Sequence, residues 1–98
     1  MSKSGFVIYH IQLIIMPKKV KVEYKKLRYA RGYFYTPENK IEIDSRLEGE
    51  ELLNTLIHEY THYLQPYLDE AQVEMIGNEM AKFLIDNGYE RTKNNRGR

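Results

Sequence analysis

Residues 58–62 read His-Glu-Tyr-Thr-His, a spacing that can hold one metal ion on a helix. Helical residues four apart lie one turn above each other, so the imidazoles of His58 and His62 point in the same direction and can bind one zinc ion. Glu59 lies one step around the helix, where its carboxylate can accept a proton from a water that attacks a carbonyl. The pattern therefore predicts zinc-dependent hydrolysis with Glu59 as the general base.

Apolar residues around the motif recur at helical spacing and place it on an amphipathic helix. This stripe consists of Leu52, Leu53, Leu56, Ile57, Tyr60 and Leu64, with the two histidines on its flank. Acidic residues at 48, 50 and 51 fit the start of a helix, where the helix dipole favours negative charge. Pro66 is expected to end the helix, because proline cannot continue its hydrogen bonding.

A second helix is predicted to begin after Asp69, with Gln72 three residues later completing a capping box. Its expected core face consists of Val73, Ile76, Met80 and Leu84. Gly77 falls in the same row and would let the two helices approach each other closely. The pair Asn87-Gly88 is expected to end this helix.

Two histidines leave one ligand to find, because a catalytic zinc normally has three protein ligands and one open position. The linker from His62 to Asp69 is short, so the two helices should form an antiparallel hairpin. The start of the second helix then faces the histidines, and Glu70 and Glu74 are both in reach. The remaining histidine, His10, is expected to be an ordinary strand residue.

The stretch from Leu53 to Phe83 resembles the gluzincin group of zinc metallopeptidases and is most similar to its smallest members, the minigluzincins. The resemblance lies in the motif at 58–62 followed by Leu-Asp-Glu-Ala at 68–71 and by Glu74. It implies one zinc ion as cofactor, Glu70 as the third ligand, Glu74 as a residue that supports the site, and endopeptidase activity on a peptide or protein substrate. Asp69 stands where the family often has asparagine.

Such chemistry also needs a donor for the tetrahedral oxyanion. Tyr63, Tyr67 and Tyr89 are near the motif in sequence. Tyrosines in a small domain more often belong to its core, so none of the three is assigned.

Three strand-like segments precede the helices: Val20–Tyr24, Tyr33–Tyr35 and Lys40–Asp44. The four residues 36–39 supply a turn between the last two segments. The apolar segment Phe6–Met16 is too short to span a bilayer and is expected to add a further strand. The predicted fold class is therefore α+β, a single zincin-like domain over residues 1–98 with a mainly antiparallel sheet of three to four strands before the two helices. Lys40–Asp44 is the expected exposed edge for an extended peptide.

The chain has 98 residues and no cysteine, which excludes disulfides, thiolate ligands and a cysteine nucleophile. No serine lies in a nucleophile context. With 42% hydrophobic and 30% charged residues, the composition is that of a soluble globular protein, and we expect a cytoplasmic protein without a membrane span. Met16 reads as an alternative translation start, which would make residues 1–15 a dispensable extension.

Charge is divided unevenly along the chain. Net charge is +6 over residues 1–46, −9 over 47–90 and +4 over 91–98. We expect the basic tail, residues 89–98, to be drawn toward the acidic helical half of its own chain or of a neighbour. The first case predicts a latent, zymogen-like enzyme, and the second a homodimer through the C-terminal segment. Separately solvated faces that happen to differ in sign would explain the same division.

The basic strand region indicates an alternative function, a non-proteolytic binding or regulatory domain on the same scaffold. Its basic residues are Lys18, Lys19, Lys21, Lys25, Lys26, Arg28 and Arg31, and interleaved Tyr24, Tyr29 and Tyr33 could stack on bases. A solvated basic face is the more common origin of this pattern, so nucleic-acid binding is kept as the alternative only.

Overall fold

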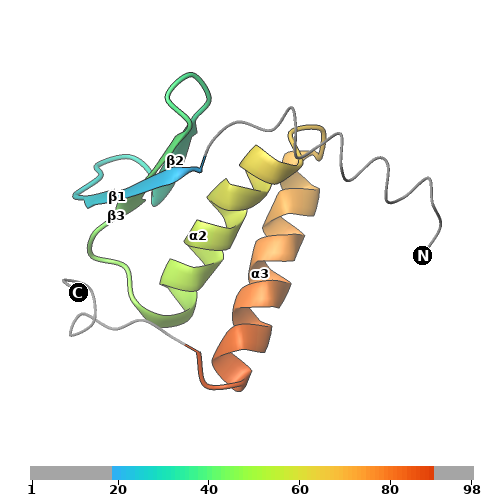
Figure 1. Cartoon of the computed structure of the whole chain (residues 1–98). Helices are drawn as coiled ribbons and strands as arrows, with labels where there is room; N and C mark the ends of the chain where they lie inside the picture. Colours follow the sequence, from blue (N-terminus) through green and yellow to red (C-terminus); the bar gives the residue numbers. More distant parts are fainter. Residues whose placement is uncertain (1–18, 90–98) are drawn as a thin grey trace.

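The computed structural model describes residues 19–89, which form a three-stranded sheet beside a pair of helices (Figure 1). The elements, in order, are β1 (Lys21–Lys25), β2 (Gly32–Tyr35), β3 (Lys40–Asp44), α2 (Gly49–Leu64) and α3 (Glu70–Asp86). The predicted α+β class, with strands before two helices, is confirmed. The expected strand Phe6–Met16, with His10 in it, and the tail after Tyr89 lie outside the described residues.

The sheet has the order β1-β3-β2 and is mixed, which corrects the expectation of mainly antiparallel pairing. The hairpin of β2 and β3 is antiparallel as predicted, but β1 pairs parallel to β3, with Lys21 opposite Lys40. The reason is that residues 26–31 cross the end of β3 before β2 begins on its other side. Two hydrogen bonds hold this crossing, from the Asp44 amide to the Arg31 carbonyl (2.8 Å) and from Arg46 Nη2 to the Leu27 carbonyl (2.7 Å).

The expectation that β3 is an exposed edge is wrong, because β3 is the central strand of the described sheet. Its isoleucines are buried, and its acidic residues are buried as well. Glu42 accepts hydrogen bonds from Lys25 Nζ and from the Tyr35 hydroxyl, both at 3.1 Å. Alternating polar residues suggested a solvated face, but an ion pair from β1 and a hydrogen bond from β2 cover Glu42 on that face. The edges of the described sheet are β1 and β2.

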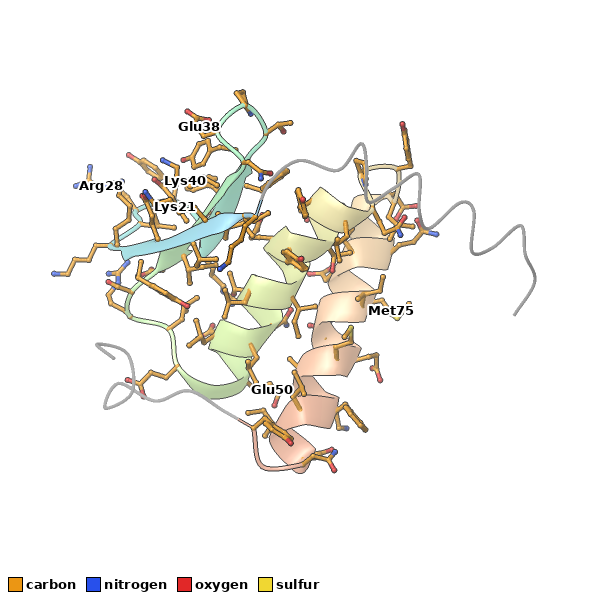
Figure 2. All side chains as sticks on the ribbon, in the orientation of Figure 1. Lys21, Arg28, Glu38, Lys40, Glu50 and Met75 are labelled. Atoms are coloured by element: carbon orange, nitrogen blue, oxygen red, sulfur yellow. The ribbon has the colours of Figure 1, made fainter. Side chains whose placement is uncertain are left out.

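The core lies between the inner face of the sheet and α2. Its buried members are Ile41, Ile43, Leu47 and Leu52, with Val20, Tyr24, Phe34 and Leu56 packed against them. The opposite face of the sheet carries charge, and Figure 2 shows Lys21, Lys40 and Arg28 projecting away from the helices. Because α3 packs on α2 on the side away from the sheet, α2 is the element that every other layer contacts (Figure 1).

The helix hairpin forms largely as predicted. The capping box is present, since the Gln72 amide donates to Asp69 Oδ1 (2.8 Å) and the Asp69 amide donates to Gln72 Oε1 (3.0 Å). α2 ends at Leu64, before Pro66, and α3 ends at Asp86, before Asn87 and Gly88, where Gly88 takes a φ of +87°.

Gly77 brings the helices together, as predicted. A Cβ atom on Gly77 would lie 2.5 Å from Asn54 Oδ1 and 3.2 Å from the Asn54 carbonyl oxygen. The predicted core face of α3 is right for Val73 but wrong for Met80, whose surface is 51% exposed. The buried row is Val73, Gly77 and Ala81. Small residues fill it because α2 is the one described element that α3 packs against closely. None of the helices in residues 19–89 has the length and apolar character needed to cross a bilayer.

Candidate metal centre

The two histidines of the motif and Glu70 converge on one point between α2 and α3. Glu70 Oε2 lies 2.9 Å from Nε2 of His58, and Glu70 Oε1 lies 3.2 Å from Nε2 of His62. The imidazole centroids are 4.9 Å apart, as expected for residues one helical turn apart. The structure therefore brings together the three residues that the sequence and the resemblance pointed to.

The spacing of these atoms suits a metal ion. One ligand atom from each of His58, His62 and Glu70 can be chosen so that all lie within 4.8 Å of one another. Ligands bound at about 2.0–2.1 Å in tetrahedral geometry are separated by about 3.3 Å, close to the two distances seen here. The Glu70 side chain is 70% exposed, so an ion could reach the cluster from solvent and keep an open position.

The relative position of His58, His62 and Glu70 depends on where α3 begins and on how closely α3 packs against α2. Glu70 is the first residue of α3, directly after the capping box that fixes where the helix begins. Two turns further along, the Asn54 side chain donates a hydrogen bond to Asn78 Oδ1 beside the close approach at Gly77. The position of Glu70 opposite the histidines therefore depends on the packing of α3 against α2.

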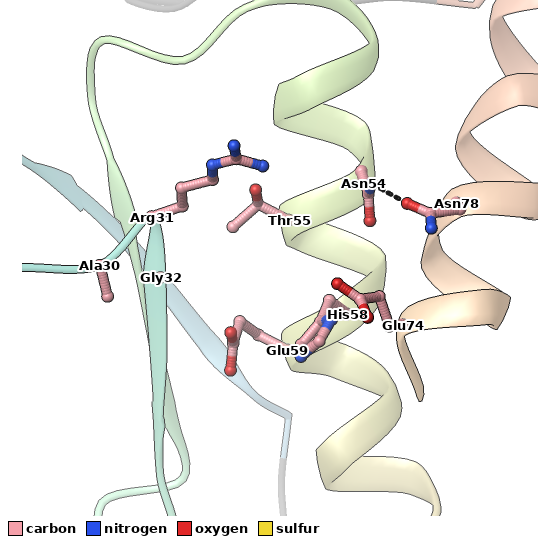
Figure 3. A pocket seen from close by; sticks show the side chains of 9 residues that line it. All are labelled: Ala30, Arg31, Gly32, Asn54, Thr55, His58, Glu59, Glu74 and Asn78. Carbon is pink, nitrogen blue, oxygen red and sulfur yellow. Dashed lines mark hydrogen bonds between the residues drawn. The ribbon is translucent and has the colours of Figure 1, made fainter. Parts of the chain in front are cut away.

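Glu59 lies next to the cluster, where it lines a pocket together with His58 and Gly32 (Figure 3). Burial raises the pKa of the Glu59 carboxyl above its usual value, and the charge of Glu70 acts in the same direction. The imidazoles of His58 and His62 act against this rise. A partly buried carboxylate of raised pKa, beside three side chains that could hold a metal ion, is suited to accept a proton.

Glu74 lines the same pocket but does not belong to the three-residue cluster. It lies one turn along α3 from Glu70, and Figure 3 shows its carboxylate beside the His58 side chain. Glu70 is thus the carboxylate that contacts both histidines. Glu74 lines the pocket together with His58.

The pocket brings in residues that sequence reasoning missed. It has a volume of about 290 Å³ and extends from the cluster along α2, with Ala30, Arg31, Gly32, Asn54, Thr55, His58, Glu59, Glu74 and Asn78 in its wall. Arg31 forms an ion pair with Glu51 at 3.2 Å. The sequence feature that could have indicated this pocket is Gly32 at the start of an aromatic strand, because a glycine there permits a close approach to a neighbouring element.

Gly32 allows β2 to lie against α2 beside Glu59. A Cβ atom on Gly32 would lie 2.9 Å from Thr55 Cγ2 and 3.2 Å from Glu59 Cγ. Both distances are shorter than ordinary carbon contacts, so a larger residue would push the strand away from the helix. The edge strand β2 therefore runs directly past the carboxylate.

The three tyrosines considered as oxyanion donors lie in different surroundings. The Tyr63 ring packs edge-on against Phe34 at 5.9 Å and contacts Tyr60 at 5.5 Å. Tyr67 and Tyr89 are exposed. None of the three is assigned to the chemistry.

Part of the basic strand region is paired with acidic residues of the strands. Lys25 and Lys40 pair with Glu42 at 3.1 and 3.4 Å, and Lys21 pairs with Glu23 at 3.5 Å. A phosphate backbone would have to compete with these ion pairs for the lysines.

No protein-family model matches this chain, and no match to a curated protein was found. The function of the chain must therefore be argued from its own residues.

Proposed function

We propose that this protein is a zinc-dependent endopeptidase whose metal ion is held by His58, His62 and Glu70. The observation that carries the proposal is the convergence of the three side chains beside a partly buried glutamate. The likeness of residues 53–83 to gluzincins supports it.

Zinc is the ion that this set of ligands suits best. Two imidazoles and one carboxylate with an open position form a common catalytic zinc site, whereas magnesium and calcium prefer all-oxygen ligands. A bound zinc ion supplies Lewis acidity, which polarises a carbonyl and lowers the pKa of water.

Glu59 is proposed as the general base. Its carboxylate accepts a proton from the attacking water and passes it to the leaving amine, so the glutamate returns to its starting state. Its location on the sheet side of α2 places it between the cluster and the edge strand β2.

The substrate is proposed to be an extended peptide that pairs with the outer edge of β2, which has no partner strand within residues 19–89. Strand addition uses main-chain hydrogen bonds and therefore accepts many sequences. Since β2 passes Glu59 at Gly32, a peptide on this edge would run past the catalytic carboxylate. Pairing along an edge leaves both peptide ends free, which favours cleavage inside a chain.

The C-terminal segment is proposed to restrain this site. The tail beyond Tyr89 is basic, whereas residues 47–90, which supply every proposed site residue, have a net charge of −9. Attraction of opposite charges would draw the tail toward the site, within the chain or from a second copy in a homodimer. The alternative is a non-proteolytic binding domain on the same scaffold. If that domain bound nucleic acid, Lys21 and Lys25 would first have to leave their ion pairs with Glu23 and Glu42.

The test is Glu59→Gln, assayed on an unstructured protein substrate alongside zinc content. Loss of a general base costs on the order of 100-fold or more in rate, whereas zinc binding should be retained because Glu59 is not a ligand. Glu50→Gln is a matched control, because Glu50 lies on the same helix two turns before the motif. Unchanged cleavage by the Glu59 variant would refute the proposal.

A further inference from the structure

An apolar groove lies on the side of α2 that faces away from His58 and His62. Its volume is about 410 Å³, and its wall consists of Val22, Ile41, Leu56, Ile57, Tyr60, Thr61, Leu64 and Met80. At 100° per residue, Leu56, Tyr60 and Leu64 lie on the side of α2 opposite His58 and His62. Leu64 and Met80 are 45% and 51% exposed, so much apolar surface on this face faces outward in residues 19–89.

The chain offers one segment whose chemistry fits this groove. Of residues 6–16, nine of eleven are apolar or aromatic, whereas residues 90–98 contain none. A basic tail cannot fill an apolar groove without loss of its hydration. The N-terminal segment can do so and would remove its own apolar surface from water at the same time.

The attachment point of that segment lies beside the groove. Asn39 Nδ2 donates a hydrogen bond to the Lys19 carbonyl (3.4 Å), and the Lys21 amide donates to the Asn39 carbonyl (3.2 Å). Val22, three residues after Lys19, is already part of the groove wall. Residues 17–19 span at most about 10 Å, so a segment that ends at Met16 is tethered within reach of the groove.

We propose that residues Phe6–Met16 pack into this groove and complete the hydrophobic core on that side of α2. A segment tethered this closely has an effective concentration in the millimolar range, which a second copy would not reach in dilute solution. The segment would then pack against one face of α2, while the opposite face carries His58 and His62. Residues 1–15 would be part of the folded domain and not a dispensable extension. This inference does not depend on the proposed enzymatic activity.

The direct test is methyl NMR of the full chain at concentrations where it is monomeric. Packing predicts nuclear Overhauser effects between methyl groups of residues 6–16 and those of Leu64, Met80 and Val22. A sample that mixes two differently labelled copies separates contacts within a chain from contacts between chains. Contacts seen solely between chains, or no contacts at all between these residues, would overturn the proposal.

A substitution pair gives a second test that does not require the truncated chain to fold. Met80→Ser removes a groove residue, whereas Met75→Ser removes a methionine of the same helix that is 56% exposed, against 51% for Met80, and lies outside the groove wall. If the segment covers Met80, its substitution lowers Tm by about 5 °C or more, and the Met75 substitution lowers Tm by less than about 2 °C. Equal shifts would mean that Met80 is as uncovered as Met75 and would contradict the proposal.

Discussion

Nε2 of His58 and Oε2 of Glu70 lie 2.9 Å apart, although the two residues are twelve positions apart in the sequence. One residue lies in the middle of α2 and the other is the first of α3, so the contact depends on the helix hairpin. Two imidazoles on one helix face are common, but together with a carboxylate from a second helix that meets both rings they form a group that could hold a metal ion.

Glu70 and Glu74 should differ in their effect on zinc affinity. Glu70→Gln removes a ligand and should weaken zinc binding by more than about 100-fold, whereas Glu74→Gln removes a neighbour of His58 and should cost about tenfold. Competition titration against a chromogenic chelator measures both affinities. A larger loss in the Glu74 variant would exchange the roles of the two residues.

Gly32→Ala should destabilise the protein, because its Cβ would press on Thr55 and Glu59. Forced overpacking costs roughly 1–3 kcal/mol, which urea denaturation would reveal as a lower midpoint. Thr55→Ser removes the nearest methyl group and keeps the hydroxyl that donates to the Glu51 carbonyl. The double variant should recover part of the loss. A fully stable Gly32→Ala protein would contradict the close approach of β2 and α2.

Asp44 should contribute stability that acid removes. Hydrogen bonds from Arg46 lower the pKa of Asp44 from 3.8 to about 2, against the opposing effect of burial. A lowered pKa in the folded state means that the contribution is present above pH 3.8 and lost as pH falls through about 2. Its size is at most about 2 kcal/mol, and partial exposure of Arg46 reduces it.

The matched experiment for Asp44 compares the native chain with Asp44→Asn by urea denaturation at pH 5 and pH 2. The native chain should be the more stable of the two at pH 5, and the difference should shrink at pH 2. A difference that is constant with pH would show that the ion pair with Arg46 is not its source.

Removal of the residues after Gly88 should raise peptidase activity if the tail restrains the site. The effect should shrink as salt rises, because screening weakens attraction between exposed charges at distances beyond about 10 Å. A chain in which the four basic residues of the tail are replaced by serine separates charge from length. The same rate in all three proteins would exclude restraint by the tail.

The local part of the site could be predicted from the sequence, since both histidines and Glu59 lie within five residues on one helix. The capping box and the close approach at Gly77 were also predictable, because each depends on residue types at fixed offsets. The choice between Glu70 and Glu74 was not settled by the residues alone, since two carboxylates one turn apart fit an antiparallel hairpin equally well.

The non-local part could not be predicted. Nothing in the residues of β1 shows that it pairs parallel to β3, because the direction depends on how the chain crosses the sheet. The strand Lys40–Asp44 alternates like an edge but lies in the centre of the described sheet, where Glu42 is bound by residues of both neighbouring strands. Met80 followed the core pattern but is half exposed, because its helix packs closely on one neighbour within residues 19–89.

The central claim is that His58, His62 and Glu70 hold one zinc ion with a position open to water. Crystals of the purified full chain, measured on both sides of the zinc absorption edge, test it most directly. The account predicts one anomalous peak within about 2.0–2.2 Å of both Nε2 atoms and of a Glu70 oxygen. An ion bound elsewhere, or no zinc in a protein exposed to equimolar zinc, would contradict it.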